Sequence, residues 1–394
     1  MDDILPTGAP SAGLATAPPE PVPEVPAGVP PTALRTFGVE EELLLVDPGT
    51  GRPAPVVGAL LAADADLAGG ADASGIAALA SELQQEQVET ATPPRTALAD
   101  VEADLRRLRD RAGAAARAVG ALVVPLATSP LPAHPSLTPT PRYRAIQDRF
   151  RLTSDQQLTC GCHVHVAVRS AEEGVAVLDR VRTWLPVVAA LAANSPYADG
   201  VDTGYAGYRT QAWWRWPTTG PADVYGSVAA YRARLRRFLD SGVPLDAGMF
   251  YPDARLSHRY PTVEVRVADV CRDVRDGVLV AALVRALVET AAREWRAGVP
   301  APDVETALIR LAAWRASRDG VEGELLHPVS GRPVPAASAV AALLDHVAVA
   351  LGEDTATVGR GAERVLARGS GATWQRATVA RTGDLTELVR RSAL

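Results

Sequence analysis

Three short segments of the sequence each carry two polar side chains separated by one residue. The pairs are Glu40 with Glu42, His163 with His165, and Glu264 with Arg266. In an extended strand, residues two apart point to the same face, so each pair presents its side chains together. A single pair is common on an exposed strand. Three pairs, with apolar residues on the other faces, predict one polar cavity within a sheet, where clustered carboxylates need cations to offset their charge.

The types of side chain in these pairs indicate the kind of cation. Carboxylate oxygens with an imidazole suit Mg²⁺ or Mn²⁺, because hard cations prefer oxygen and accept an occasional nitrogen. Several carboxylates imply more than one ion. Magnesium ions beside an arginine fit phosphoryl transfer, in which catalysis consists mainly of positioning and charge neutralisation. We find no pattern of a hydrolytic triad.

The composition narrows the possible chemistry further. The 394 residues include forty Lys plus Arg, and all forty are arginine. A P-loop needs its lysine and a Schiff base needs an amine, so both classes are excluded. The net charge of −6 and the lack of a basic stripe argue against a nucleic-acid surface. Any phosphate must therefore be met by arginine, backbone or metal.

The chain organisation predicts one large folded unit. Residues 1–33 are rich in Pro, Ala and Gly without a hydrophobic period, and we expect a disordered tail there. Residues 34–394 are predicted to form a single domain. No apolar run reaches the ~18 to 20 residues that span a bilayer, and we expect no membrane partner. Three cysteines are too few for a disulfide framework and no signal peptide is evident, so a cytoplasmic location is expected.

The elements that must position the polar pairs follow from hydrophobic spacing. An apolar run closed by turn residues predicts a strand over residues 37–47, and a short apolar run predicts a buried strand over 121–127. Alternation predicts two more strands, over residues 161–168 and 262–267. Helical spacing predicts helices over residues 97–119, 142–150, 171–194, 275–295, 304–318 and 339–351, with a final helical stretch to 391. Residues 130–141 are predicted to be a Pro-rich loop. Residues 195–226 are predicted to form a long aromatic loop. Loops of that length are usually functional or disordered, and the density of aromatic residues favours a functional one.

Six motifs occur in an order that resembles a known family. They are 38–42 (GVEEE), Glu82 with 87–90 (QVET), 160–165 (CGCHVH), 194–197 (NSPY), 202–205 (DTGY) and 262–266 (TVEVR). The chain resembles the carboxylate–amine ligases of the type 2 glutamate–cysteine ligase family, within the glutamine synthetase-like superfamily. This resemblance implies an α+β fold, a funnel of mainly antiparallel sheet with surrounding helices, that holds ATP and an acid substrate with metal ions between them.

The same resemblance implies roles for individual residues. The implied metal ligands are Glu40, Glu42, Glu82, Glu89, His163 and Glu264. His165 would lie nearer the nucleotide, and Arg209 in the aromatic loop would bind the carboxylate of the substrate. Arg266 would contact the transferred phosphate or the acyl phosphate and, with Glu264, would be catalytic.

Several assignments stay open at the level of sequence. Glu82 and Glu89 are spaced by seven, which also fits an ordinary solvated helix face with Glu86; on a strand this spacing needs a bulge or bend. Glu41 is expected to face the opposite side and to be structural. The cysteines of 160–162 are expected to be small buried side chains rather than a metal pair. The remaining histidines are expected to be ordinary surface or core residues: His134, His258, His327 and His346.

The predicted function is an ATP-dependent ligation of a carboxylate to an amine through an acyl phosphate, with glutamate and cysteine, or another amine, as substrates. The family suggests a homo-oligomer. One alternative is a metal-dependent amide hydrolase that uses the His-x-His strand; it fits poorly because no repeating βα barrel is visible. Another is a scaffold that kept the fold, which would predict damaged carboxylates, whereas all six expected ligands are present.

Overall fold

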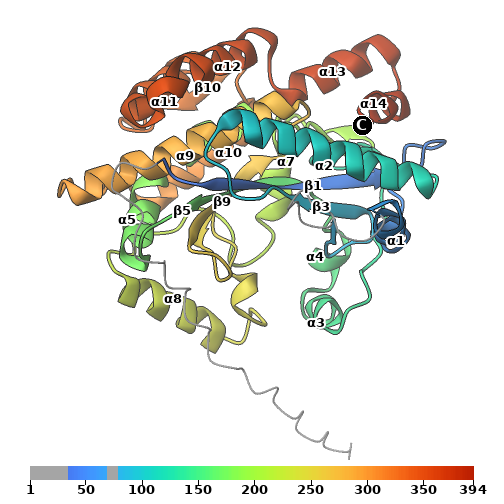
Figure 1. Cartoon of the computed structure of the whole chain (residues 1–394), viewed down its shortest axis with the longest axis horizontal. Coiled ribbons are helices and arrows are strands. Elements are labelled where there is room, and N and C mark those ends of the chain that lie inside the picture. The colour runs from blue at the N-terminus through green and yellow to red at the C-terminus, as the bar shows by residue number, and fades with distance from the viewer. Residues whose placement is uncertain (1–33, 69–78) are drawn as a thin grey trace, which may run out of the picture.

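An open antiparallel sheet of seven strands forms the centre of the structure, a computed structural model that describes residues 34–68 and 79–394 (Figure 1). The predicted tail, residues 1–33, lies outside the described residues. The strand order is β2-β3-β1-β5-β9-β8, and β4 also pairs with β1. The strands are β1 (Phe37–Val46), β2 (Ala80–Ser81), β3 (Gln87–Ala91), β4 (Leu122–Val124), β5 (Gly161–Ala167), β8 (Ala254–Leu256) and β9 (Thr262–Asp269).

A layer of helices covers one face of this sheet. Alternation along β1 points Phe37 and Val39 toward this layer, where both are almost fully buried, and turns Glu40 to the other face. Figure 1 shows α2 and α9 above β1 and further helices beyond them. The helices of the first half are α1 (Val57–Ala68), α2 (Leu98–Ala118), α5 (Ala171–Val181) and α6 (Leu185–Ala192). Those of the second half are α9 (Val274–Arg296), α10 (Thr306–Asp319), α11 (Ala336–Leu351), α12 (Thr355–Arg368), α13 (Gly371–Thr382) and α14 (Leu385–Arg391).

The main hydrophobic core fills the space between the sheet and these helices. It joins residues of β1, β5 and β9 to α2, α5, α6, α9 and α11. The sheet is therefore apolar toward the helices and free to carry polar groups on its other face.

Shorter elements lie toward that other face or connect the layers. Figure 1 shows α3, α4 and α8 on the side of the sheet away from α2. These elements are α3 (Pro141–Phe150), α4 (Leu152–Asp155), α7 (Tyr208–Trp213), α8 (Val228–Asp240) and the 3₁₀ turns η1 (Ala247–Met249) and η2 (Gly352–Asp354). Two hairpins complete the fold: β6 (Tyr197–Ala198) with β7 (Val201–Asp202), and β10 (Glu324–Leu326) with β11 (Pro333–Pro335).

The four predicted strands and most predicted helices are confirmed, with three differences. The helix expected over 171–194 is divided into α5 and α6, because Pro186 in the first turn of α6 has no N–H to continue the earlier helix. The aromatic segment 195–226 contains α7 and the β6–β7 hairpin rather than only loop. The short strands β2, β3 and β8 were not among the expected strands.

One stretch of the described residues, Ala336–Thr382, includes a window apolar enough to cross a membrane by length and composition. That stretch is divided among α11, η2, α12 and α13. In α11, Leu343 and Val347 are fully buried in the main core, which is the arrangement of a core helix.

Candidate active site

The polar face of the sheet aligns carboxylates and imidazoles across neighbouring strands. Strand register makes four pairs of direct neighbours: Glu89 with Glu42, Glu40 with His163, His165 with Glu264, and Glu264 with Arg255. Directly opposed residues of antiparallel strands hold their Cβ atoms about 4.5–5.5 Å apart. The three polar pairs of the sequence are therefore brought together in one row that runs from β3 to β8.

A register shift between β5 and β9 changes the direction of one side chain in this row. Cys162 pairs with Ala268 and Val164 pairs with Val265, so two residues of β9, Arg266 and Val267, lie opposite the single residue His163. An extra residue of this kind bends the strand and re-aims its side chains. Arg266 thereby reaches back to donate a hydrogen bond to the carboxylate of Glu264.

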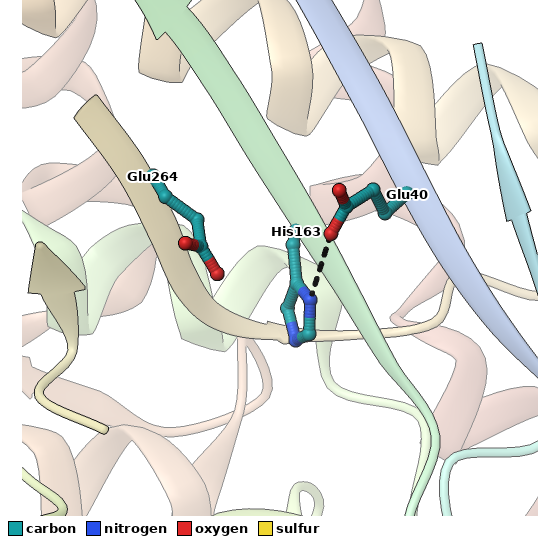
Figure 2. A group of neighbouring side chains, drawn as sticks. All are labelled: Glu40, His163 and Glu264. Carbon is teal, nitrogen blue, oxygen red and sulfur yellow. Dashed lines mark ion pairs between the residues drawn. The ribbon is translucent and has the colours of Figure 1, made fainter. Parts of the chain in front are cut away.

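Glu40, His163 and Glu264 form a cluster whose ligand atoms all lie within 4.8 Å of one another (Figure 2). His163 Nδ1 is 3.5 Å from Glu40 Oε2, and its Nε2 is 3.8 Å from Glu42 Oε1. Figure 2 shows these three side chains coming from three different strands toward a common point. Two carboxylates and an imidazole in this arrangement could hold a divalent cation.

The charges of the carboxylates are unevenly compensated across the row. Burial is the largest effect at Glu42 and raises its pKa to about 7, with a further upward contribution from Glu82. Burial and Glu82 likewise raise the pKa of Glu89 well above its ordinary value. At Glu40, burial acts upward but is outweighed by His163 and His165, which hold its pKa far below the ordinary range. Arg209, Arg266 and the backbone N–H of Gly161, which donates to Glu42 Oε2 at 2.6 Å, lower the pKa of Glu42 but do not offset its burial. A metal ion would supply further positive charge at this end of the row.

The two histidines differ in their surroundings. Among the described residues, His163 Nε2 is buried without a hydrogen-bond partner, whereas His165 Nε2 lies 3.2 Å from Glu40 Oε1. Burial acts to lower the pKa of His165, but Glu40 outweighs it and the pKa is raised. Burial lowers the pKa of His163 to about 4, helped by the charge of Arg266, so its imidazole is neutral and keeps a lone pair. His165 is held from its other side by Thr262 Oγ1, 3.0 Å from Nδ1. The residues present therefore fit a divalent cation.

Glu264 is compensated by two arginines. Arg255 Nε donates to Glu264 Oε2 at 2.7 Å and its Nη2 to Oε1 at 3.2 Å, while Arg266 donates to Oε1. Burial alone would raise the pKa of Glu264, but Arg266 and Arg255 bring it well below its ordinary value. The guanidinium of Arg266 also lies 5.8 Å from the ring centres of both Trp213 and Tyr251. A charged Arg266 framed by aromatic rings could meet a phosphate.

Arg209 reaches the same region from α7 and passes over the start of β5. A Cβ atom at Gly161 would lie 2.8 Å from Arg209 Cζ, so only glycine leaves room for this guanidinium. The backbone N–H of Arg209 donates to Ser195 Oγ at 2.9 Å, and this hydroxyl donates to Asp269 Oδ2 at 2.7 Å. Residues of the 160–165 and 194–197 motifs thus position Arg209, which is buried.

Glu82 and Glu89 are brought together by a hairpin. β2 pairs with β3 so that Ala80 lies opposite Glu89, and Glu82 follows directly after β2. The helical interpretation of their spacing is wrong, and no bulge is needed, because a turn lies between them. Glu86 points elsewhere: both of its carboxylate oxygens accept the backbone N–H of Ser136 at 3.0 Å.

Residues expected to be structural are found in structural roles. Glu41 turns to the helical face and accepts two hydrogen bonds from Arg109. The three cysteines are free and buried. His346 stacks on Trp184 with ring centres 4.2 Å apart.

Sequence reasoning missed three charged residues of this region, of which Arg255 and Asp269 are buried and Asp253 is half-buried. Arg255 pairs with Glu264, Asp269 anchors Ser195, and Asp253 has its pKa raised to about 7 by burial, against the opposing charges of Arg310 and Arg209. Asp253 and Arg255 show the same spacing of two as the other polar pairs. That signal could have identified a further strand beside β9.

The chain is similar in sequence to one family of known proteins. A family model described as glutamate-cysteine ligase family 2 (GCS2) matches residues 36–391. The protein named "Putative glutamate--cysteine ligase 2" from Streptomyces coelicolor is 49% identical over 358 residues, which cover 90% of this chain and 97% of that protein. "Putative glutamate--cysteine ligase 2-1" from Paenarthrobacter aurescens is 49% identical over 363 residues, which cover 91% and 94%.

Two solved structures share the fold. Glutamate–cysteine ligase from Francisella tularensis, in complex with AMP, has a TM-score of 0.65 at 13% identity and covers 91% of this chain and 87% of its own. A bifunctional glutathione synthetase from Pasteurella multocida has a TM-score of 0.65 at 14% identity, with 91% and 51% covered. The α+β, glutamine synthetase-like fold expected from the sequence is confirmed. The family model matches residues 36–391, and relatives are nearly half identical to this chain along nine tenths of its length. The chain therefore belongs to glutamate–cysteine ligase family 2.

Proposed function

We propose that this chain is an ATP-dependent carboxylate–amine ligase, with glutamate as the acid and cysteine as the first amine to test. The observation that carries the proposal is the row of carboxylates, imidazoles and arginines across β3, β1, β5, β9 and β8, in a member of this family. The names of the relatives and the AMP complex of the Francisella neighbour support ATP and glutamate as substrates.

The reaction would proceed in two steps. A carboxylate oxygen of the acid attacks the γ-phosphorus of ATP, the bond to the leaving ADP breaks, and an acyl phosphate forms. The amine then attacks the acyl carbon, loses a proton, and expels inorganic phosphate to leave the amide. Negative charge on the phosphoryl oxygens must be offset throughout the first step.

The residues proposed to hold Mg²⁺, or Mn²⁺ in its place, share the polar face of the sheet: Glu40, Glu42, Glu82, Glu89, His163 and Glu264. When bound, the ions would supply positive charge beside the phosphates. Two observations on the described residues favour this assignment: His163 Nε2 is buried without a hydrogen-bond partner, and the pKa of Glu42 is raised despite the nearby arginines.

Other side chains would bind the reacting groups directly. Arg266 is proposed to contact the transferred phosphate, because its buried guanidinium keeps donors beyond those used by Glu264. Arg209 is proposed to bind the substrate carboxylate, and His165 to lie nearer the nucleotide. The rings of Trp213 and Tyr251 beside Arg266 would restrict water that could hydrolyse the acyl phosphate.

The domain organisation, the cellular location and the assembly of the chain are also part of the proposal. We propose that residues 34–394 act as one ligase domain, since the sheet takes strands from residues 37 to 269 and α9–α12 share its core. A cytoplasmic location and assembly into a homo-oligomer stay predictions. The hydrolase alternative is less well supported, because the His-x-His strand lies in the middle of an antiparallel sheet in a ligase family.

The test is to incubate the protein with Mg²⁺, ATP, glutamate and a panel of amines. The amount of ADP released and the mass of the product are then measured. Amine-dependent ADP release with a matching amide mass would support the ligase and identify the amine. Amide cleavage without ATP would instead support the hydrolase.

A further inference from the structure

A cavity of about 510 Å³ opens on the helical face of the sheet, away from the row of carboxylates. Its walls come from α2, from the segment that joins β9 to the start of α9, and from Leu394. They include four arginines and two aspartates: Arg106, Arg109, Arg272, Arg275, Asp110 and Asp273. The volume is within the range of ~300–1,000 Å³ found for small-molecule sites. Three of these arginines are already paired with carboxylates, Arg109 with Glu41, Arg106 with Glu102 and Arg275 with Asp273, so the attraction for an anion depends on Arg272.

Arg272 is the strongest reason to expect a ligand there. Its guanidinium lies 4.1 Å from the ring centre of Trp374, and within the described ranges no carboxylate is paired with it. By contrast, Arg275 in the first turn of α9 is paired with Asp273. The side chain is half-buried, and burial lowers the pKa of Arg272 although Asp273 and Asp276 act in the opposite direction, so its charge is only partly offset.

The other three arginines differ in how firmly they are held. Arg109 is a fixed part of the wall, because Glu41 takes two of its hydrogen bonds and the carbonyls of Cys271 and Arg272 take two more. Arg106 is paired on the exposed surface with Glu102. Such exposed pairs contribute little and exchange easily, so Arg106 is free to turn toward a ligand. Arg275 is held more firmly, because its guanidinium donates two hydrogen bonds to Asp273.

We propose that this cavity is a second binding site, separate from the active site, for a small organic anion with two negative charges, either a phosphate ester or a dicarboxylate. Arg272 would form the forked contact to a phosphate or carboxylate group, with Arg106 and Arg275 adding charge at the rim. Asp110 and Asp273 in the same walls would repel an anion, so the ligand would bind next to Arg272.

The site can be tested without the ligase reaction. Glycerol 2-phosphate and succinate serve as the two probes, each titrated calorimetrically into the metal-free, nucleotide-free protein. We expect at least one probe to bind, and the stronger one to identify the chemistry of the anionic group. Arg272→Gln should weaken that binding by about tenfold or more, whereas Arg272→Lys, which keeps the charge, should retain part of it.

Two further variants test whether the anion binds in this cavity or elsewhere on the protein. Arg237→Gln removes an exposed arginine of α8, which lies on the opposite side of the sheet from α2 (Figure 1), and should bind as the unchanged protein does. Arg266→Gln alters the active site and should also leave binding unchanged. Loss of binding in Arg266→Gln with full binding in Arg272→Gln would place the anion in the active site and overturn the proposal. So would no binding of either probe up to about 10 mM.

Discussion

Glu42 of β1 and Glu89 of β3 lie directly opposite each other in the sheet, although both carry carboxylates. Like charges in directly opposed positions destabilise a sheet, and burial raises the pKa of both carboxyls, so the folded metal-free protein must hold either a buried like charge or a proton there. Glu89→Gln should therefore raise the melting temperature of the metal-free protein. It should also lower magnesium-dependent ADP release by about 100-fold, because a proposed ligand is lost. Thermal melts in EDTA and ADP assays in Mg²⁺ measure the two effects.

Glu86→Gln is the matched control for this change. Glu86 is only three residues away, but its carboxylate accepts the backbone N–H of Ser136 and faces away from the row. The variant should lose a little stability and keep its activity. If Glu89→Gln destabilised the metal-free protein and left turnover intact, the proposed site would be wrong at this position.

The pair between Arg109 and Glu41 should be essential for folding rather than for chemistry. Both side chains are at most 4% exposed and share two hydrogen bonds of 2.7 and 2.8 Å. Arg109→Met would leave a buried carboxylate unpaired and should cost about 3–5 kcal/mol of unfolding free energy. Urea denaturation measures this loss. Arg106→Met, which removes an exposed pair with Glu102, should cost at most about 1 kcal/mol.

A single methyl group at position 161 should displace Arg209. The added Cβ of Gly161→Ala would lie 2.8 Å from Arg209 Cζ, so the guanidinium must move. Misplacement of a binding group by about 1 Å can cost on the order of 100-fold in rate, and we expect a loss of that size in kcat/KM for the acid substrate. Gly359→Ala, which meets no atom within 4 Å in α12, should leave kinetics unchanged. Equal kinetics in both variants would remove Arg209 from the proposed site.

His346 should make stability sensitive to mild acid. Burial lowers the pKa of His346 below 6.5, although Glu294 acts in the opposite direction. The unfolded chain therefore takes up a proton at a pH where the folded protein does not. The contribution is full above pH 6.5 and is lost as the pH falls from 6.5 through the folded pKa. His346→Phe, which keeps a ring against Trp184 but cannot titrate, should lose less unfolding free energy between pH 7.5 and pH 5.

Urea melts of the two proteins at several pH values give the comparison directly. Because the other histidines are shared, the difference between the two curves reports on position 346 alone. Parallel curves over this range would show that His346 does not have the lowered pKa.

Strand alternation was sufficient to find most of the polar row from sequence. The side-chain period of two is a local property, so Glu40 with Glu42 and His163 with His165 could be assigned to one face without knowledge of the fold. Their mutual positions depend on register between distant strands. No local pattern predicts that His163 lies opposite Glu40, which is 123 residues earlier.

The parts that the sequence did not reveal are short or depend on tertiary contacts. β2 and β8 have two and three residues, too few for a recognisable period, so the hairpin at Glu82 and the partner Arg255 were not foreseen. The bulge that re-aims Arg266 arises only when β5 and β9 pair. Ser195 and Asp269, which hold Arg209, are joined across 74 residues and also needed the fold.

The central claim is that the polar face of the sheet carries out ATP-dependent amide synthesis. Its most direct test measures ADP and amide together, with Mg²⁺, ATP, glutamate and cysteine or the amine found by the panel, in the unchanged protein, Glu264→Gln and Glu86→Gln. We predict one ADP per amide in the unchanged protein and in Glu86→Gln, and loss of both products in Glu264→Gln with the fold retained. Full turnover by Glu264→Gln, or amide formed without ATP, would contradict the account.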